Sequence, residues 1–173
     1  MRQQPQCGTG HAVQQALPLL AADEQVLVLS GDVPLIQPDT LRALCDCSAG
    51  AALALLTIRL PDATGYGRIV RQGEAVQAII EQRDATPAQC AIDEVYSGIM
   101  ALPAAWLKRW LPLLRPHNAQ GELYLTDIVA LAVADGAPVR ALRSDDAWQV
   151  AGVNSPAQLA ALVAHLHIPL ASI

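Results

Sequence analysis

The sequence predicts a domain of the α/β class with a mostly parallel sheet. Short apolar runs of strand pattern alternate along the chain with segments of helical pattern, and this alternation is typical of parallel sheets covered by helices. Residues 25–29 form the clearest strand, because a run of branched apolar residues ends abruptly at Gly31 and Asp32. Two short β-like runs, 68–70 and 75–80, interrupt the alternation. We expect them to form a β-hairpin inserted near the sheet edge or the functional site.

The remaining elements follow from local pattern and capping residues, taken in order. We expect helices over 12–17, 38–44, 103–114, 125–135 and 156–165, and strands over 51–60, 97–101, 139–142 and 150–153. Pro18 would end or kink the first helix, and Gly136 and Pro138 end the fourth. Ser155 is the expected N-cap of the last helix. Trp106 and Trp110 share one face of the third helix, where we expect core packing rather than a ligand platform.

Composition bounds the class of protein. The 173 residues suit one domain, and a hydrophobic content of 53% is enough for a large core. A net charge of -5 without a basic cluster argues against nucleic acid as a partner, although a nucleotide needs only one or two positive groups. The chain carries no apolar run of membrane-spanning length and no signal-peptide pattern, so we expect no membrane association and a cytoplasmic location. The four cysteines match no metal or redox spacing and are expected to be free, buried thiols.

Candidate site residues follow strands or lie in glycine-rich turns. Asp32 comes directly after a buried strand, where open α/β sheets bind ligands, and Gly31 lets a ligand approach the backbone. A helix cap is the alternative role for Asp32. The other candidates are Gly8-Thr9-Gly10, Gly65-Tyr66-Gly67-Arg68, Glu81, Ser97-Gly98 and Asn154.

Singly these candidates are weak signals, since Tyr66 could lie in an ordinary turn and Glu81 could be an exposed acid. Together they predict a site for a phosphorylated, hydroxyl-rich ligand. Glycine N–H groups hold phosphate oxygens, and carboxylates accept from sugar hydroxyls. Asp32 and Asn154 offer the oxygen ligands that a hard divalent cation prefers.

At these residues the chain resembles the uridyltransferase domain of a bifunctional family, the N-acetylglucosamine-1-phosphate uridyltransferase / glucosamine-1-phosphate acetyltransferases (GlmU). The segments that carry the resemblance run in order with similar spacing over nearly the whole chain. They are 6–12 (QCGTGHA), 31–35 (GDVPL), 62–69 (DATGYGRI), 81 with 84–86, 118–127 (NAQGELYLTD) and 152–154 (GVN).

The resemblance implies a Rossmann-like nucleotide-diphospho-sugar transferase fold and a reaction. N-acetylglucosamine 1-phosphate would attack the α-phosphorus of UTP, giving UDP-N-acetylglucosamine, a precursor of peptidoglycan and lipopolysaccharide, and pyrophosphate. By the same resemblance Asp32 and Asn154 are the catalytic residues and hold Mg²⁺. The implied nucleotide contacts are Gln3, Gly8, Thr9, Ser30, Gly31 and Asp32, and the implied sugar contacts are Gly67, Glu81, Tyr96 and Asn154.

Two positions depart from the family pattern. Ser30 stands where relatives have Tyr, and Tyr96 stands where a sugar-contacting Asn is expected; a Tyr hydroxyl can still donate or accept a hydrogen bond. These departures motivate one alternative, a nucleotidyltransferase for another base or sugar 1-phosphate. A second alternative, a degenerate nucleotide-sugar-binding remnant, is motivated by the missing glycine-rich phosphate loop of the family.

The resemblance also predicts how the chain is divided. Residues 1–154 would be a partial uridyltransferase domain without its first strands and glycine-rich phosphate loop, and 155–173 the start of a connecting helix. We therefore expect this chain alone to be inactive or very weak and prone to self-association. The parent protein would be a homotrimer held by a C-terminal β-helix absent from this sequence.

Overall fold

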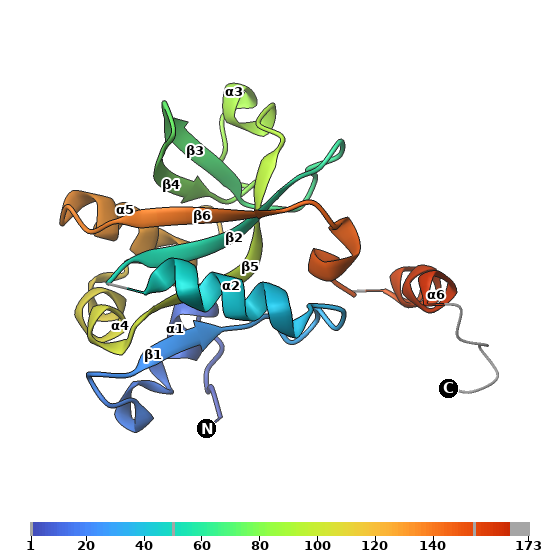
Figure 1. Cartoon of the computed structure of the whole chain (residues 1–173). Coiled ribbons are helices and arrows are strands. Elements are labelled where there is room, and N and C mark those ends of the chain that lie inside the picture. Colours follow the sequence, from blue (N-terminus) through green and yellow to red (C-terminus); the bar gives the residue numbers. More distant parts are fainter. Residues whose placement is uncertain (1, 50, 154, 167–173) are drawn as a thin grey trace.

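A six-stranded sheet forms the centre of the molecule (Figure 1). The structure is a computed structural model that describes residues 2–49, 51–153 and 155–166. The strand order is β4-β3-β5-β2-β6, and β1 also pairs with β5. The strands are β1 (Gln25–Val28), β2 (Leu53–Arg59), β3 (Arg68–Gln72), β4 (Ala75–Ile80), β5 (Glu94–Pro103) and β6 (Val139–Ser144).

The described residues also form six α-helices and several 3₁₀ turns, of which α6 lies apart from the sheet (Figure 1). The helices are α1 (Thr9–Gln14), α2 (Pro38–Ser48), α3 (Pro87–Cys90), α4 (Ala104–Trp110), α5 (Ile128–Ala134) and α6 (Pro156–His165). The α/β class is thereby confirmed. Pro38 opens α2, as expected for a residue without a backbone donor in the first turn. Ser155 caps α6 by accepting a hydrogen bond from the Gln158 N–H at 3.2 Å, also as expected.

The expectation of a mostly parallel sheet is wrong. Among the described residues only β2 and β6 pair in parallel, whereas β5 runs antiparallel to β1, β2 and β3. β3 is antiparallel to both β4 and β5, so β5 runs in the same direction as β4. The link through α3 therefore crosses over β3 and inserts β5 against strands that run the opposite way. The apolar character of β5 reports its central position and not its direction.

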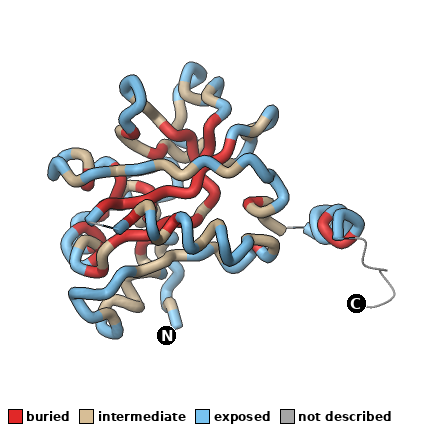
Figure 2. Tube along the Cα trace, in the orientation of Figure 1, coloured by how far each residue is buried: buried red, intermediate tan, exposed pale blue. Residues whose placement is uncertain are grey.

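Both faces of the sheet are covered, which explains the continuous apolar runs of the central strands (Figure 2). On one face Leu53 and Leu55 pack with Trp110 of α4 and Ile128 of α5. On the other face Leu56 packs with the α2 side. These alternating side chains of β2 are fully buried, so β2 anchors both halves of the core.

Other expectations from the sequence fare unequally. The hairpin is confirmed, with β3 and β4 antiparallel at one edge of the sheet. Trp110 is buried and its ring lies 5.0 Å from that of Trp106, so core packing is confirmed. The strand expected over 150–153 is wrong: a 3₁₀ turn, Ala147–Val150, precedes residues without strand pairing.

The cysteine expectation is half right. All four thiols are free. None is fully buried: Cys90 is exposed and the other three are half-buried. No helix among the described residues has the length and apolarity to cross a bilayer.

Candidate active site

The candidate site lies where two strands, β1 and β3, pair with different parts of the same edge of β5. β1 pairs with β5 only from Met100 to Pro103, and β3 reaches the same edge only at Val95. Between these contacts, the stretch 97–99 has no strand beside it on this edge. A cavity of about 460 Å³ opens at this gap. Its walls come from six parts of the chain: residues 28–32, 65–67, 96–98, 125–126, Glu81, and Thr9 with Ala12 and Val13 of α1.

Glu81 provides a partly buried carboxylate in this cavity. It follows β4 directly, and its Oε1 accepts a hydrogen bond from the Thr126 hydroxyl at 3.0 Å. Burial raises the pKa of Glu81, and the Thr126 hydrogen bond opposes this only in part. Asp127 and Asp84 also raise the pKa. A half-buried carboxylate with one filled acceptor position can accept from ligand hydroxyls.

Gly67 and Tyr96 lie beside Glu81. The Tyr96 N–H donates to the Gly67 carbonyl at 2.9 Å, which ties the start of β3 to β5. A Cβ on Gly67 would stand 2.8 Å from Ile79 Cγ2 and 3.5 Å from both Glu81 oxygens, so glycine keeps this wall open. The Tyr96 hydroxyl is buried and has no hydrogen-bond partner among the described residues. Burial, together with the charge of Glu81, raises the pKa of Tyr96, so the hydroxyl stays protonated.

The side chains of Gln82 and Arg68 hold the turn that carries Gly65 and Tyr66. Gln82 Oε1 accepts from the Gly65 N–H and from Arg68 at 3.4 Å. The Arg68 guanidinium also donates to the Tyr66 carbonyl. Arg68 is almost fully buried, so it acts as a fixed support for the turn rather than as a ligand contact.

Ser30 lies across the gap from this turn. Its hydroxyl donates to the Gly98 carbonyl at 3.2 Å. Gly98 has φ +87, and a Cβ there would stand 2.3 Å from Ser30 Oγ. The close approach of the segment after β1 to β5 at this point therefore requires glycine.

The N-terminal glycine segment is mainly structural. Gly8 has φ +105, and a Cβ on it would meet the Leu123 carbonyl oxygen at 2.7 Å. Gly10 N–H donates to the same carbonyl at 2.7 Å. Thr9 lines the cavity, and its Oγ1 accepts from the Leu125 N–H at 3.0 Å. Gly8 and Gln3 do not line this cavity; Gln3 instead donates to the Gly8 carbonyl and contacts His11.

Asp32 stands at the mouth of the cavity with an exposed carboxylate. Its carbonyl accepts from the Val153 N–H at 2.8 Å, so the chain just before residue 154 runs alongside it. Asn154, the second expected metal ligand, lies outside the described residues. No group of three or more His, Cys, Asp and Glu side chains that could hold a metal occurs in the part of the chain that the structure describes.

The geometry thus gathers most of the expected residues around one cavity. It adds Thr126 and Gln82, to which the sequence assigned no role. Thr126 belongs to the quoted segment 118–127, which was the available signal, but its partner Glu81 lies 45 positions away in the sequence.

Comparison with known proteins shows similarity to nucleotidyltransferases. A family model described as a MobA-like NTP transferase domain matches residues 1–63. The bifunctional protein GlmU of Albidiferax ferrireducens is 68% identical over 162 residues, which cover 94% of this chain and 35% of that protein. The GlmU of an Acidovorax species is also 68% identical, over 163 residues. The resemblance to GlmU is confirmed.

Solved structures agree on the fold. A UDP-glucose pyrophosphorylase in complex with UDP-glucose superposes with a TM-score of 0.72 over 96% of this chain at 14% identity. A putative glucose-1-phosphate thymidylyltransferase from Bacillus anthracis gives 0.70 at 18% identity, covering 94% of this chain and 62% of that one. The chain therefore has the Rossmann-like nucleotidyltransferase fold. It spans about a third of the length of the GlmU relatives that it matches.

Proposed function

We propose that this chain carries the uridyltransferase site of a GlmU protein, which transfers uridylyl from UTP to N-acetylglucosamine 1-phosphate and releases pyrophosphate. The observation that carries the proposal is the 68% identity to a GlmU protein over 94% of the chain. The product, UDP-N-acetylglucosamine, is a large ligand with many hydroxyls, and the cavity of about 460 Å³ with its carboxylate suits such a ligand.

In this proposal one side of the gap in the sheet binds the sugar and the other side binds the nucleotide. Glu81 accepts from sugar hydroxyls, the Tyr96 hydroxyl donates to the sugar, and Gly67 leaves room for the ring. Ser30, Gly31 and Thr9 face the nucleotide. Gln3 and Gly8 shape this end of the site through the contacts of α1, since neither lines the cavity.

The donor set fits Mg²⁺, which is usually held by one or two protein oxygens together with substrate phosphates. Asp32 would hold the ion with its exposed carboxylate, and Asn154 with its amide oxygen. When bound, Mg²⁺ neutralises phosphate charge. The chain's own contribution is positioning, on which phosphoryl-transfer chemistry largely depends. The proposal includes a cytoplasmic location and the homotrimeric parent.

Calorimetric titration of UDP-N-acetylglucosamine into the chain with Mg²⁺ tests the proposal. Asp32→Ala should abolish the Mg²⁺-dependent part of binding. Tyr96→Phe should weaken binding by about tenfold, the effect of losing one hydrogen bond to a buried group. It should not lower stability, because the hydroxyl has no protein partner. Tyr124→Phe is the matched control, because its hydroxyl bonds Gln120 outside the cavity.

The proposal fails if the folded chain does not bind UDP-N-acetylglucosamine. Equal affinity of the wild type and Tyr96→Phe would remove Tyr96 from the sugar contacts. A second candidate is transfer to another sugar 1-phosphate, favoured by Tyr96 and Ser30 in the cavity walls. Tighter binding of UDP-glucose or dTDP-glucose than of UDP-N-acetylglucosamine would select that candidate.

A further inference from the structure

A second, differently charged cleft lies between β6 and the β3–β4 hairpin, apart from the nucleotide cavity. It has a volume of about 630 Å³. Four arginines line it: Arg59 of β2, Arg71 of β3, and Arg140 and Arg143 of β6. We call it the arginine cleft. Four of the chain's eleven basic side chains thus meet at one place in a protein of net charge -5.

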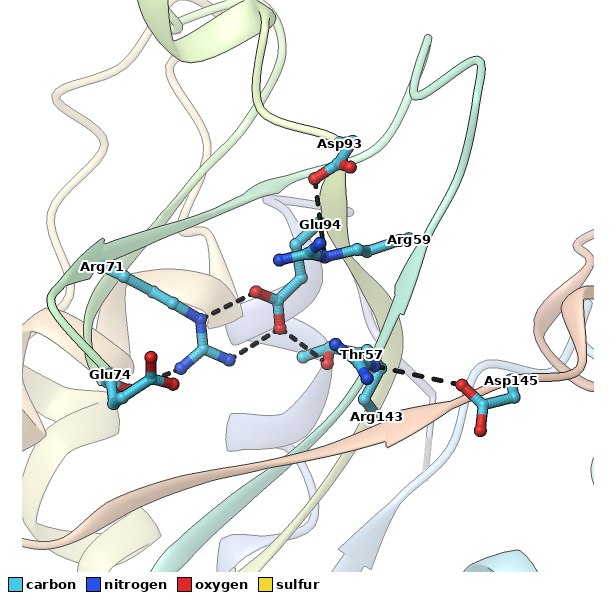
Figure 3. A network of polar contacts seen from close by, with 8 residues as sticks. All are labelled: Thr57, Arg59, Arg71, Glu74, Asp93, Glu94, Arg143 and Asp145. Carbon is cyan, nitrogen blue, oxygen red and sulfur yellow. Dashed lines mark hydrogen bonds and ion pairs between the residues drawn. The ribbon is translucent and has the colours of Figure 1, made fainter.

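Two of these arginines, Arg71 and Arg140, donate hydrogen bonds to other groups of the protein. Arg71 donates to Glu94 from Nε and from a terminal nitrogen, both at 2.7 Å, and this bidentate pair also receives a hydrogen bond from Thr57 at 2.9 Å (Figure 3). The pair neutralises Glu94, which is almost fully buried. Arg140 donates to the carbonyls of Cys47 and Ala49, which hold the side chain without cancelling its charge.

The other two arginines, Arg59 and Arg143, are weakly engaged. Arg59 is 3.7 Å from Asp93, and Arg143 is 4.0 Å from Asp145. Both acids are exposed, and Asp145 is 96% so. Neither guanidinium donates a hydrogen bond within the described ranges. Exposed ion pairs at such distances contribute little, so both acids can turn toward water when a better acceptor arrives.

The positions of these two arginines suit a shared ligand. Arg143 pairs with Thr57 in the parallel register of β2 and β6, and Arg59 stands two residues further along β2 on the same face. Both also line a smaller hollow of about 330 Å³ that adjoins the end of β2. Two planar guanidinium groups on neighbouring strands therefore border the same open space.

We propose that the arginine cleft binds an oxyanion of the phosphate class between Arg59 and Arg143. Guanidinium groups match phosphate oxygens in pairs, and phosphate offers more acceptor oxygens and more charge than a carboxylate. Two guanidiniums can therefore share one phosphate. The acids that face the site are Glu74, Glu94, Asp93 and Asp145; Glu94 is neutralised by Arg71, and the latter two are the exposed partners that the anion replaces.

The test is a titration of the ¹⁵N-labelled chain with inorganic phosphate at constant ionic strength, followed by NMR. We expect saturable shifts of amides near Arg59, Gly73 and Arg143, and none in the 65–67 turn. The double variant Arg59→Gln/Arg143→Gln should bind about tenfold or more weakly, because charge-assisted hydrogen bonds are lost. Its folding should be unaffected, since both side chains are more than half exposed.

The matched control is Arg42→Gln/Arg115→Gln, which removes the same charge from exposed positions away from the cleft. A parallel titration with glycerol 3-phosphate separates a free phosphate ion from the phosphate of a larger molecule, which should bind more tightly. Absence of saturable shifts with either probe would overturn the proposal. So would shifts confined to the nucleotide cavity, or equal weakening in the two double variants.

Discussion

The Arg71–Glu94 ion pair should contribute strongly to folding stability, because it joins β3 to β5 and is largely buried. Glu94 Oε1 and Oε2 accept three hydrogen bonds, two from Arg71 at 2.7 Å and one from Thr57 at 2.9 Å. The Glu94 side chain is 8% exposed and that of Arg71 is 27% exposed. Glu94→Gln removes the charge and one acceptor while keeping the shape.

The expected cost is about 2–3 kcal/mol. Breaking a buried pair by neutralising one partner costs about 3–5 kcal/mol, because a charge remains buried without compensation. Here the cost is reduced, because water reaches a quarter of the Arg71 side chain. For a domain of this size the loss corresponds to a fall of about 5–10 °C in the melting temperature. Urea unfolding at pH 7 measures the free energy directly.

The pH dependence separates the ion pair from a packing effect. Arg71 lowers the pKa of Glu94 in the folded state, against the opposing effect of burial and with help from Thr57. A lowered pKa stabilises the folded state above the unfolded value, near 4.3, and this contribution is lost as the pH falls through the folded value. The stability difference between wild type and Glu94→Gln should therefore be constant near neutral pH and shrink below about pH 4.

Glu122→Gln is the control, because no charged partner engages that carboxylate in the described structure. Equal unfolding midpoints for the two variants at pH 7 would refute the reasoning. A difference that persists unchanged at pH 3 would also refute it. The double variant Arg71→Gln/Glu94→Gln should be more stable than the sum of its single variants predicts.

Three further predictions concern the cavity and the core. Burial raises the pKa of Glu81 in the folded state, so ionisation of this carboxyl above the unfolded pKa lowers the stability of the fold. Glu81→Gln should therefore unfold at a higher urea concentration than wild type at pH 7 and at the same concentration below about pH 4. The variant should also bind UDP-N-acetylglucosamine more weakly. Gly98→Ala should lower stability by about 1–2 kcal/mol from its positive φ alone and lose further stability by displacing Ser30. Gly136 also has a positive φ of +70, but a Cβ there would meet no neighbouring atom. Gly136→Ala should therefore show only the backbone cost of about 1–2 kcal/mol and leave ligand affinity unchanged. Leu56→Ala should lower the free energy of unfolding by about 2–5 kcal/mol, since the side chain is fully buried, and a smaller loss would mean that the core closes over the cavity.

Local sequence pattern predicts the elements of this fold well, because each strand and turn is specified by nearby residues. The expected strand 51–60 contains β2, and the hairpin appears with its turn at Gly73. Strand direction was not predictable in the same way. The apolar run in β5 is compatible with either direction, because it reflects burial on both faces; the direction depends on which strands β5 enters between, and no local pattern encodes that.

The site was predictable to the extent that its residues follow strands. Asp32 and Glu81 follow strands, Gly67 lies in the glycine-rich turn before β3, and all three line one cavity. Gln3 was expected at the nucleotide on the basis of resemblance, yet in this structure its side chain is bound to Gly8 and His11. Thr126 was missed because its role depends on a contact with Glu81 that no local pattern encodes.

The cavity exists because no strand pairs with residues 97–99 on one edge of β5, and side chains provide hydrogen-bond partners there in place of a strand. Where β1 and β3 diverge along β5, the backbone of 97–99 would lack partners, and unpaired buried backbone groups are costly. Small hydroxyls fill this need. Ser30 donates to the Gly98 carbonyl, and Ser97 accepts from the Ile99 N–H. Ser97 also donates to the Leu56 carbonyl of β2, where the pairing of β2 with β5 shifts register. A strand beside 97–99 would provide backbone partners in place of Ser30 but would occupy the space that the ligand needs. Serine and glycine at the gap therefore reconcile a stable sheet with an open site, and residues at positions 30, 97 and 98 serve the fold and the proposed function at once.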